Sequence, residues 1–219
     1  MATEVDICNM ALAHLGADAN IASIAPPDGS EEAGHCARMY PLARTYLLAG
    51  TVAWGFAKRR VALAELENDS LDWTHKYQLP SDFLHVLHVI ARTNNQTVFS
   101  LADLEDGNGA RQVAPYPLGA SAPCDIEGSA LYTNEPNAEL LYVRDTVDTG
   151  KFPPRFTMAM SYYLAALLCG PLVKGATGRA LAKSFIELAL RTAADAGGLD
   201  ANASYDPPQP PASSIRARA

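Results

Sequence analysis

The chain has 219 residues, of which 48% are hydrophobic, so it can bury the core of one domain or of two small ones. Its formal net charge of −7 argues against tight, sequence-independent binding of nucleic acid, because such binding needs clustered Lys and Arg side chains. No apolar run approaches the ~18 residues that span a bilayer, and the N-terminus lacks the basic segment of a signal peptide. We therefore expect no membrane partner and folding in a reducing cytoplasm.

Two helices are predicted at the N-terminal end. The first covers residues 3–15, where Thr3 can cap the helix and Gly16 can stop it. The second begins after Ser30, another capping residue. Pro41 lies inside the second pattern and should kink or locally break the helix, because proline removes a backbone donor.

Residues 52–65 change to a strand-like pattern. On a strand, Trp54 and Phe56 would point to the same side, and Gly55 between them would let another backbone approach closely. We expect these two aromatic side chains to form a structural anchor between a helical part and a β part. The basic cluster at residues 58–60 (KRR) is expected to be a solvated strand or helix end.

Strand and turn signals replace the helical period in the middle of the chain. The pattern predicts strands over residues 84–90, 97–99, 124–132 and 138–143, turns at 94–95 and 134–137, and a long loop over 101–122.

Helical spacing returns at about residue 154. Gly170-Pro171 should weaken or bend this third helix, and a fourth is predicted over residues 177–195, closed by Gly197-Gly198.

The composition changes again at the C-terminal end. Residues 206–219 read DPPQPPASSIRARA and have no apolar repeat, which predicts an extended, flexible tail. Ile215, Arg216 and Arg218 near its end are the candidate residues for contact with a partner.

This order of elements predicts an α+β fold. A helical bundle formed by the N-terminal and C-terminal segments would carry an inserted antiparallel β-rich domain. The expected division is a discontinuous helical domain over residues 1–65 and 150–200, an inserted domain over 66–149, and the extended tail over 201–219.

The cysteines do not form a recognisable chemical motif. Cys8, Cys36, Cys124 and Cys169 are widely spaced, so free buried thiols are expected in place of disulfides or zinc. Cys36 follows His35 directly, but adjacent helical residues diverge by about 100° and cannot face each other as a nucleophile and its base.

Other polar clusters are equally weak as sites. His85 and His88 are three residues apart, and on a regular strand they would point to opposite faces and would not share a metal ion. The acidic residues at 103–106 lack the spacing of a calcium loop, and residues 175–179 (GATGR) lack the ending of a phosphate-binding loop. We therefore expect no catalytic residue, no metal and no cofactor.

Four groups of short motifs occur in a characteristic order. They are residues 7–16 (ICNMALAHLG) with 21–24 and 31–40, residues 43–48 with 54–57, residues 77–86 (YQLPSDFLHV), and residues 126–128, 131–134, 141–143, 152–156 and 164–166. Together they resemble the tail tubular protein A family, the head-to-tail adaptor proteins of short-tailed bacteriophages. Members of that family often have a longer polar residue where Gly55 stands, and the tail after residue 200 has no counterpart.

The resemblance implies a structural protein and no catalytic residues. It implies a homo-oligomeric ring of twelve copies in the virion, attached to the portal protein on one side and the tail nozzle protein on the other, with tail fibres at its rim. Twelve copies at −7 would give the ring a formal charge of about −84, so a lumen lined by acidic residues would let DNA pass without holding it. Two alternatives remain open: a head-completion or tail-terminator ring protein, and a cysteine-dependent hydrolase.

Overall fold

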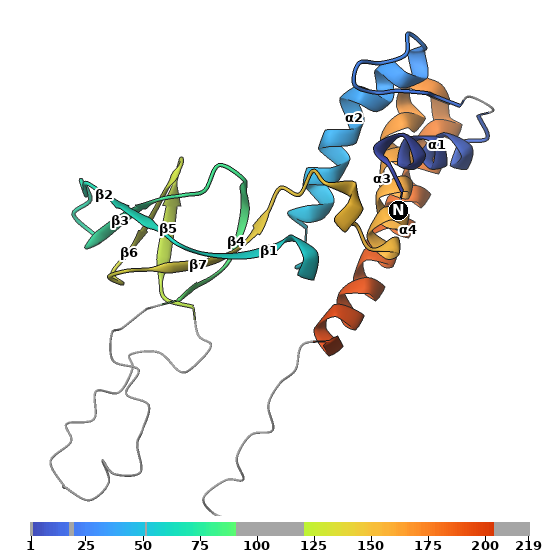
Figure 1. The fold of residues 1–219 in the computed structure, drawn as a ribbon. Helices are drawn as coiled ribbons and strands as arrows, with labels where there is room; N and C mark the ends of the chain where they lie inside the picture. The colour runs from blue at the N-terminus through green and yellow to red at the C-terminus, as the bar shows by residue number, and fades with distance from the viewer. Residues whose placement is uncertain (1, 18–19, 51, 91–120, 204–219) are drawn as a thin grey trace, which may run out of the picture.

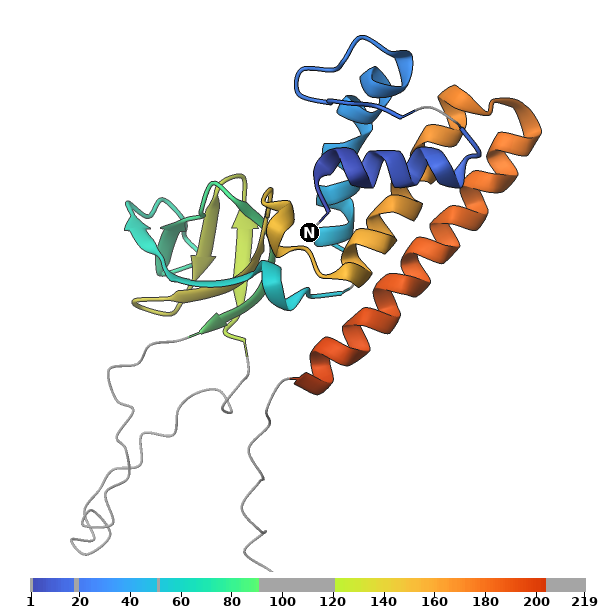
Figure 2. The same cartoon turned by 45° about the vertical axis from the view of Figure 1, so that its right-hand side comes forward.

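The computed structural model describes residues 2–17, 20–50, 52–90 and 121–203. The described residues form a helical part and a β part that lie side by side along one axis (Figures 1 and 2). The fold is α+β, as the sequence predicts. Within these ranges, no helix has both the length and the apolar character that a membrane span requires.

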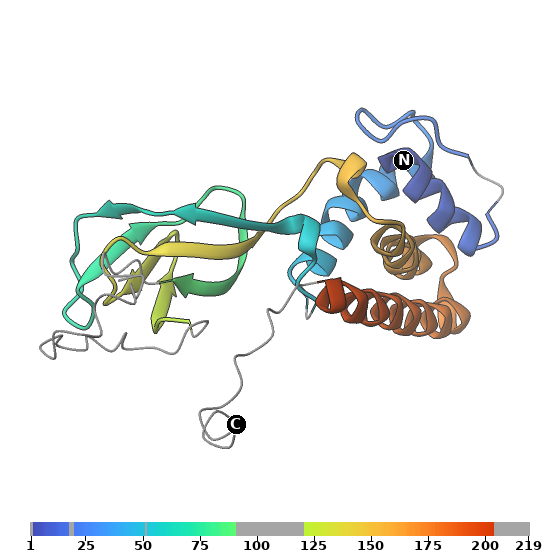
Figure 3. The same ribbon diagram turned by 60° about the horizontal axis from the view of Figure 1, so that its bottom comes forward.

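The helical part is organised around one central helix. Its helices are α1 (Glu4–His14), α2 (Glu31–Leu48), α3 (Pro154–Leu172) and α4 (Gly175–Ala203). α3 packs against each of the other three, and Figure 3 shows it almost end-on between α1 in dark blue, α2 in light blue and α4 in orange-red. The N-terminal and C-terminal segments thus share one hydrophobic core, which the predicted discontinuous bundle requires.

The first two helices begin at the residues that the sequence indicates. The Thr3 hydroxyl accepts a hydrogen bond from the Asp6 backbone N–H at 3.1 Å, and the Asp6 carboxylate accepts one from the Thr3 backbone N–H at 2.8 Å. These hydrogen bonds lower the pKa of Asp6. The Ser30 hydroxyl accepts from the Ala33 backbone N–H at 3.2 Å, which caps α2 in the same way.

A predicted local break at Pro41 and a predicted helix end at Gly197-Gly198 do not occur. α2 runs through Pro41 without a break, and Pro41 lies on its exposed side. α4 continues through Gly197-Gly198 to Ala203. A Cβ atom on Gly197 would lie 2.9 Å from Cγ1 of Val52, so this glycine provides close packing inside the helix.

The β part contains two antiparallel sheets. Its strands are β1 (Lys58–Ala62), β2 (Ala64–Leu66), β3 (His75–Gln78), β4 (Phe83–Ile90), β5 (Cys124–Glu127), β6 (Ala130–Thr133) and β7 (Glu139–Arg144). One sheet has the order β1-β7-β4 and the other the order β2-β3-β6-β5. A second hydrophobic core, which includes Tyr77, Leu131 and Tyr142, lies in this part.

The strand predictions need two corrections. Trp54 and Phe56 are not on a strand, because Gly55–Ala57 forms a short 3-10 turn (η1) before β1. The predicted strand over 124–132 is a hairpin of β5 and β6 that turns at Gly128, which has a φ of 59°. β6 and β7 follow each other along the chain, as predicted, and belong to different sheets.

The predicted domain boundary at residue 65 falls after β1 and inside β2, which are strands of the two sheets. The β part therefore begins at Lys58, at the end of η1. α4 likewise extends past the predicted boundary at residue 200. The predicted turn at 94–95, the strand at 97–99 and most of the loop at 101–122 lie outside the described residues.

Candidate assembly surfaces

The predicted anchor residues lie in the helical core. Trp54 is buried, and its indole N–H donates a hydrogen bond to the Leu47 carbonyl at 3.0 Å. Its ring meets Phe156 of α3 edge-on, with centroids 4.9 Å apart, and Phe56 contacts the same ring at 5.1 Å. Both aromatic side chains therefore pack the first connection between the helical and β parts against α3. They do so from a turn and not from a strand.

An ion pair holds the second connection between the two parts, where the chain returns from β7 to the helices. Arg44 of α2, only 8% exposed, donates two hydrogen bonds of 2.9 Å to the carboxylate of Asp145, which follows β7. A paired geometry of this kind positions both groups more firmly than a single contact. The two residues are 101 positions apart, so the pair closes the helical part directly onto the end of the β part.

Asp82 connects the Arg44–Asp145 pair to the β part. Its carboxylate accepts a hydrogen bond from the Tyr142 hydroxyl at 2.7 Å and lies 3.3 Å from the Arg59 guanidinium. Its backbone carbonyl accepts from the Asp145 N–H at 2.8 Å. Burial and the nearby Asp82 carboxylate raise the pKa of Tyr142 to about 12, so the phenol remains a neutral donor.

An open apolar depression of about 430 Å³ lies where the helical and β parts meet. It is lined by Leu42, Thr45, Tyr46, Ala49, Leu84, Tyr163 and Leu167, and we call these residues the junction groove. Leu42 is 59% exposed and Tyr46 is 51% exposed, which is unusual for large side chains that border one depression. Tyr46 and Tyr163 stack with ring centroids 4.5 Å apart, so the groove has a rigid aromatic wall.

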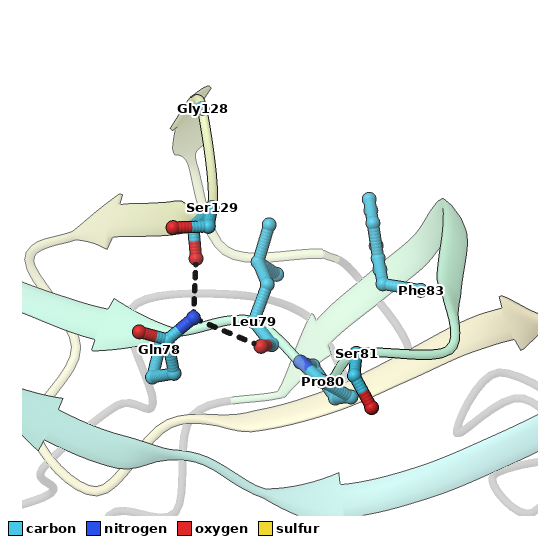
Figure 4. Close-up of a pocket in the computed structure, with 7 residues that line it drawn as sticks. All are labelled: Gln78, Leu79, Pro80, Ser81, Phe83, Gly128 and Ser129. Carbon is cyan, nitrogen blue, oxygen red and sulfur yellow. Dashed lines mark hydrogen bonds between the residues drawn. The ribbon is translucent and has the colours of Figure 1, made fainter.

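A second depression, of about 470 Å³, lies beside the turn after β3 (Figure 4). The Gln78 side chain donates hydrogen bonds to the carbonyls of Leu79 and Ser129, at 3.1 and 3.0 Å. None of the residues that line it carries a charge or a nucleophilic thiol. It therefore has no group that would perform acid–base chemistry.

The cysteine environments do not support the hydrolase alternative. Cys8, Cys36 and Cys169 are buried. A hydrogen bond with the Cys36 thiol, together with burial, raises the pKa of Cys8, and burial raises the pKa of Cys124 and Cys169. The same hydrogen bond with Cys8 lowers the pKa of Cys36. A nucleophilic cysteine needs an accessible thiol beside a base, whereas the thiol of Cys36 is buried and His35 contacts Arg38 at 2.8 Å.

His85 and His88 lie on the same face of the sheet, contrary to the prediction. Two register shifts in β4 place them opposite Val143 and Leu141, which are two residues apart on β7. Both histidines are exposed. Within the described ranges, no three His, Cys, Asp or Glu residues gather as metal ligands would.

Several predicted residues cannot be placed in these surfaces. The acidic residues at 103–106 and the tail candidates Ile215, Arg216 and Arg218 lie outside the described residues. Residues 58–60 form most of β1 and are exposed, which agrees with the predicted solvated strand. No sequence pattern predicts the Arg44–Asp145 pair, because nothing local links residues so far apart.

The comparisons with known proteins provide no family assignment. No protein-family model matches this chain. No curated protein matches it either.

Proposed function

We propose that this chain is the structural adaptor subunit of a short-tailed bacteriophage. Twelve copies would form a ring between the portal protein and the tail nozzle protein, close the filled head and line the conduit through which DNA leaves. The chain would belong to the virion at the head-to-tail junction, after synthesis in the cytoplasm of the bacterial host.

The observation that carries the proposal is where the family-like motifs lie in the fold. Ile7 and Leu12 of the first motif and Trp54 of the second are buried in the helical core. Tyr77 of the third and Leu131 of the fourth are buried in the β core. Residues that build the two cores and their connection are the ones that resemble the adaptor family, which supports a shared fold and, by analogy, a shared role.

The surface supports an assembly role on independent physical grounds. A ring of identical subunits needs contacts between two unlike faces that close after a fixed rotation. The junction groove supplies one exposed apolar face, and an exposed apolar patch of this kind typically marks an interaction site. The Arg44–Asp145 pair and the contact of Trp54 with Phe156 would hold such faces in a constant relative orientation.

The test is to mix the purified chain with its cognate portal protein and to examine the product by electron microscopy. A ring of this chain seated on the portal is the expected result. A mixture without any ring would contradict the adaptor role. In images of whole virions, density of this chain at the far end of the tail would favour a tail terminator. Replacing all four cysteines by serine should leave ring formation intact, whereas a hydrolase that depends on one of them would lose its activity.

A further inference from the structure

Two of the four cysteines meet inside the helical core. Cys8 of α1 and Cys36 of α2 are both 0% exposed and belong to the same hydrophobic core. The two helices contact each other and lie side by side in Figure 3. The thiols of Cys8 and Cys36 hydrogen-bond to each other across this contact. A pair of thiols in this arrangement needs only a short approach of the two sulfur atoms to reach the ~2.05 Å of a disulfide bond.

The other two thiols have no such neighbour. All four cysteines lie in the described part of the chain. Burial alone raises the pKa of Cys169, and burial with the charge of Asp125 raises the pKa of Cys124 in β5. Among the described residues, therefore, only Cys8 and Cys36 act on each other as thiols. The fold selects this one pairing from those that four cysteines allow.

A bond between these two sulfur atoms would add a connection that packing supplies only weakly. α1 packs mainly against α3 and touches α2 lightly. A disulfide would join α1 to α2 directly and would restrict the unfolded chain between positions 8 and 36.

The surroundings of the pair include a polar donor. Tyr40 lies one turn after Cys36 on the same face of α2. It is 1% exposed, and within the described residues its hydroxyl has no hydrogen-bond partner. Burial raises the pKa of Tyr40, so the phenol stays protonated. A buried donor of this kind favours an intermediate that carries an extra oxygen atom as acceptor.

We infer that Cys8 and Cys36 form a redox site that a peroxide converts into an intrachain disulfide between α1 and α2. In a reducing cytoplasm the site is a dithiol, and after release of the particle into an oxidising medium it closes. The inference goes beyond the proposed function, and the chemistry of the site does not depend on the adaptor role.

The reaction balances with one molecule of hydrogen peroxide. The Cys36 thiol loses its proton, and its sulfur attacks one peroxide oxygen. The O–O bond breaks, and the leaving hydroxide takes up that proton as water. The Cys8 sulfur then attacks the Cys36 sulfur of the resulting sulfenic acid, and the S–O bond breaks. The second hydroxide takes the Cys8 proton, so two thiols lose two electrons and the peroxide becomes two waters.

The order of the two steps follows from the two thiols. Cys36 reacts first, because the hydrogen bond lowers its pKa and raises that of Cys8. Since both sulfur atoms are buried, the peroxide reaches them when α1, a short helix near the N-terminus, opens locally.

Mass spectrometry of the full chain tests the site. The purified protein is treated with a small excess of hydrogen peroxide, quenched with catalase, and digested beside its acidic residues without reduction. Asp28 lies between the two cysteines, so their peptides stay joined only through a disulfide. The expected product is a linked pair of peptides that contain Cys8 and Cys36, two hydrogens lighter than their sum, which dithiothreitol separates.

Thermal denaturation provides a second measurement. The peroxide-treated chain should melt about 5–10 °C above the reduced chain, and dithiothreitol should remove the difference. Cys8→Ala should show neither the linked peptides nor this rise. Cys169→Ala, at another buried cysteine of the same core, is the matched control and should keep both. If Cys8→Ala does not fold, the two measurements on the parent chain decide.

Several outcomes overturn the inference. They are four free thiols after peroxide treatment, a disulfide that joins other cysteines, a linked pair without a rise in melting temperature, or a rise that Cys8→Ala retains. A chain whose thiols all stay free but which still forms a ring on the portal refutes the redox site and leaves the adaptor role standing. A chain that closes the disulfide but forms no ring does the reverse.

Discussion

At the residue scale, the anchor is the most informative position. The aromatic spacing of Trp54 and Phe56 predicts a structural anchor, and the burial of Trp54 agrees with that role. The backbone conformation predicted for it is wrong, because alternation of two aromatics around a glycine fits a strand and a short turn equally well. The contact with Phe156 of α3 comes from a residue about 100 positions later, and no local pattern reports it.

Truncation of the anchor should destabilise the helical core. Trp54→Ala is expected to lower the free energy of unfolding by about 3–5 kcal/mol, because it removes a fully buried side chain and leaves a cavity. Urea denaturation followed by circular dichroism measures the change. Val147→Ala, at a position that is 56% exposed, should change stability by less than about 0.5 kcal/mol. A loss below ~1 kcal/mol for Trp54→Ala would refute the anchor.

Removal of the charge at Asp145 should also be costly. Asp145→Asn leaves the nearly buried Arg44 guanidinium without its counter-charge, and we expect a loss of about 1–3 kcal/mol in the free energy of unfolding. Asp148→Asn, in the exposed pair of Asp148 with Lys151, is the matched control and should lose less than about 0.5 kcal/mol. Equal effects in chemical denaturation would show that the buried pair has no special role.

At the element scale, local signals predict where helices begin better than where they end. Thr3 and Ser30 were recognised because a cap is satisfied within three residues of the chain. The pattern at Gly197-Gly198 wrongly predicts a helix end, because glycine serves both to end a helix and to admit a close neighbour. Only the position of Val52 distinguishes the two uses, and that position depends on the tertiary fold.

The sheets illustrate the same limit. The strand over residues 84–90 was predicted from composition, and β4 covers Phe83–Ile90. Its register shifts and its pairing with β7 were not predicted, so the faces of His85 and His88 were assigned wrongly. Pairing depends on segments far apart in the chain, and alternation alone does not record a bulge.

Substitution of Gly197 should test the close approach of α4 to Val52. Gly197→Val is expected to cost about 1–3 kcal/mol, because the added side chain overlaps Val52. Combining it with Val52→Ala should recover part of that loss, which a double-mutant cycle by thermal denaturation measures. Gly34→Ala in α2 meets no atom within 4 Å and should be neutral or stabilising. Additive losses in the cycle would contradict a direct contact.

At the scale of the whole molecule, the α+β class and the helical part built from both ends of the chain were predictable. The return of helical spacing after a β-rich segment indicates that the outer segments pack together. The junction groove was not predictable, because it depends on residues that only the fold brings together.

Deletion of residues 206–219 tests the predicted role of the tail. The truncated chain should bind its cognate portal at least about tenfold more weakly, if Ile215, Arg216 and Arg218 contact that partner. Its melting temperature should not change, because the two hydrophobic cores lie within residues 2–203. Portal affinity measured by surface plasmon resonance decides the question, and unchanged affinity would remove the tail from the interface.

The two crossings between the helical and β parts have a mechanical consequence. Lys58 at the start of β1 pairs with Val143 near the end of β7, so the chain leaves and re-enters the bundle at neighbouring points. Tension applied at the start of α1 and the end of α4 is borne by the four helices, which pack around one core. The two sheets are inserted between α2 and α3, so they bear no tension until the helices separate.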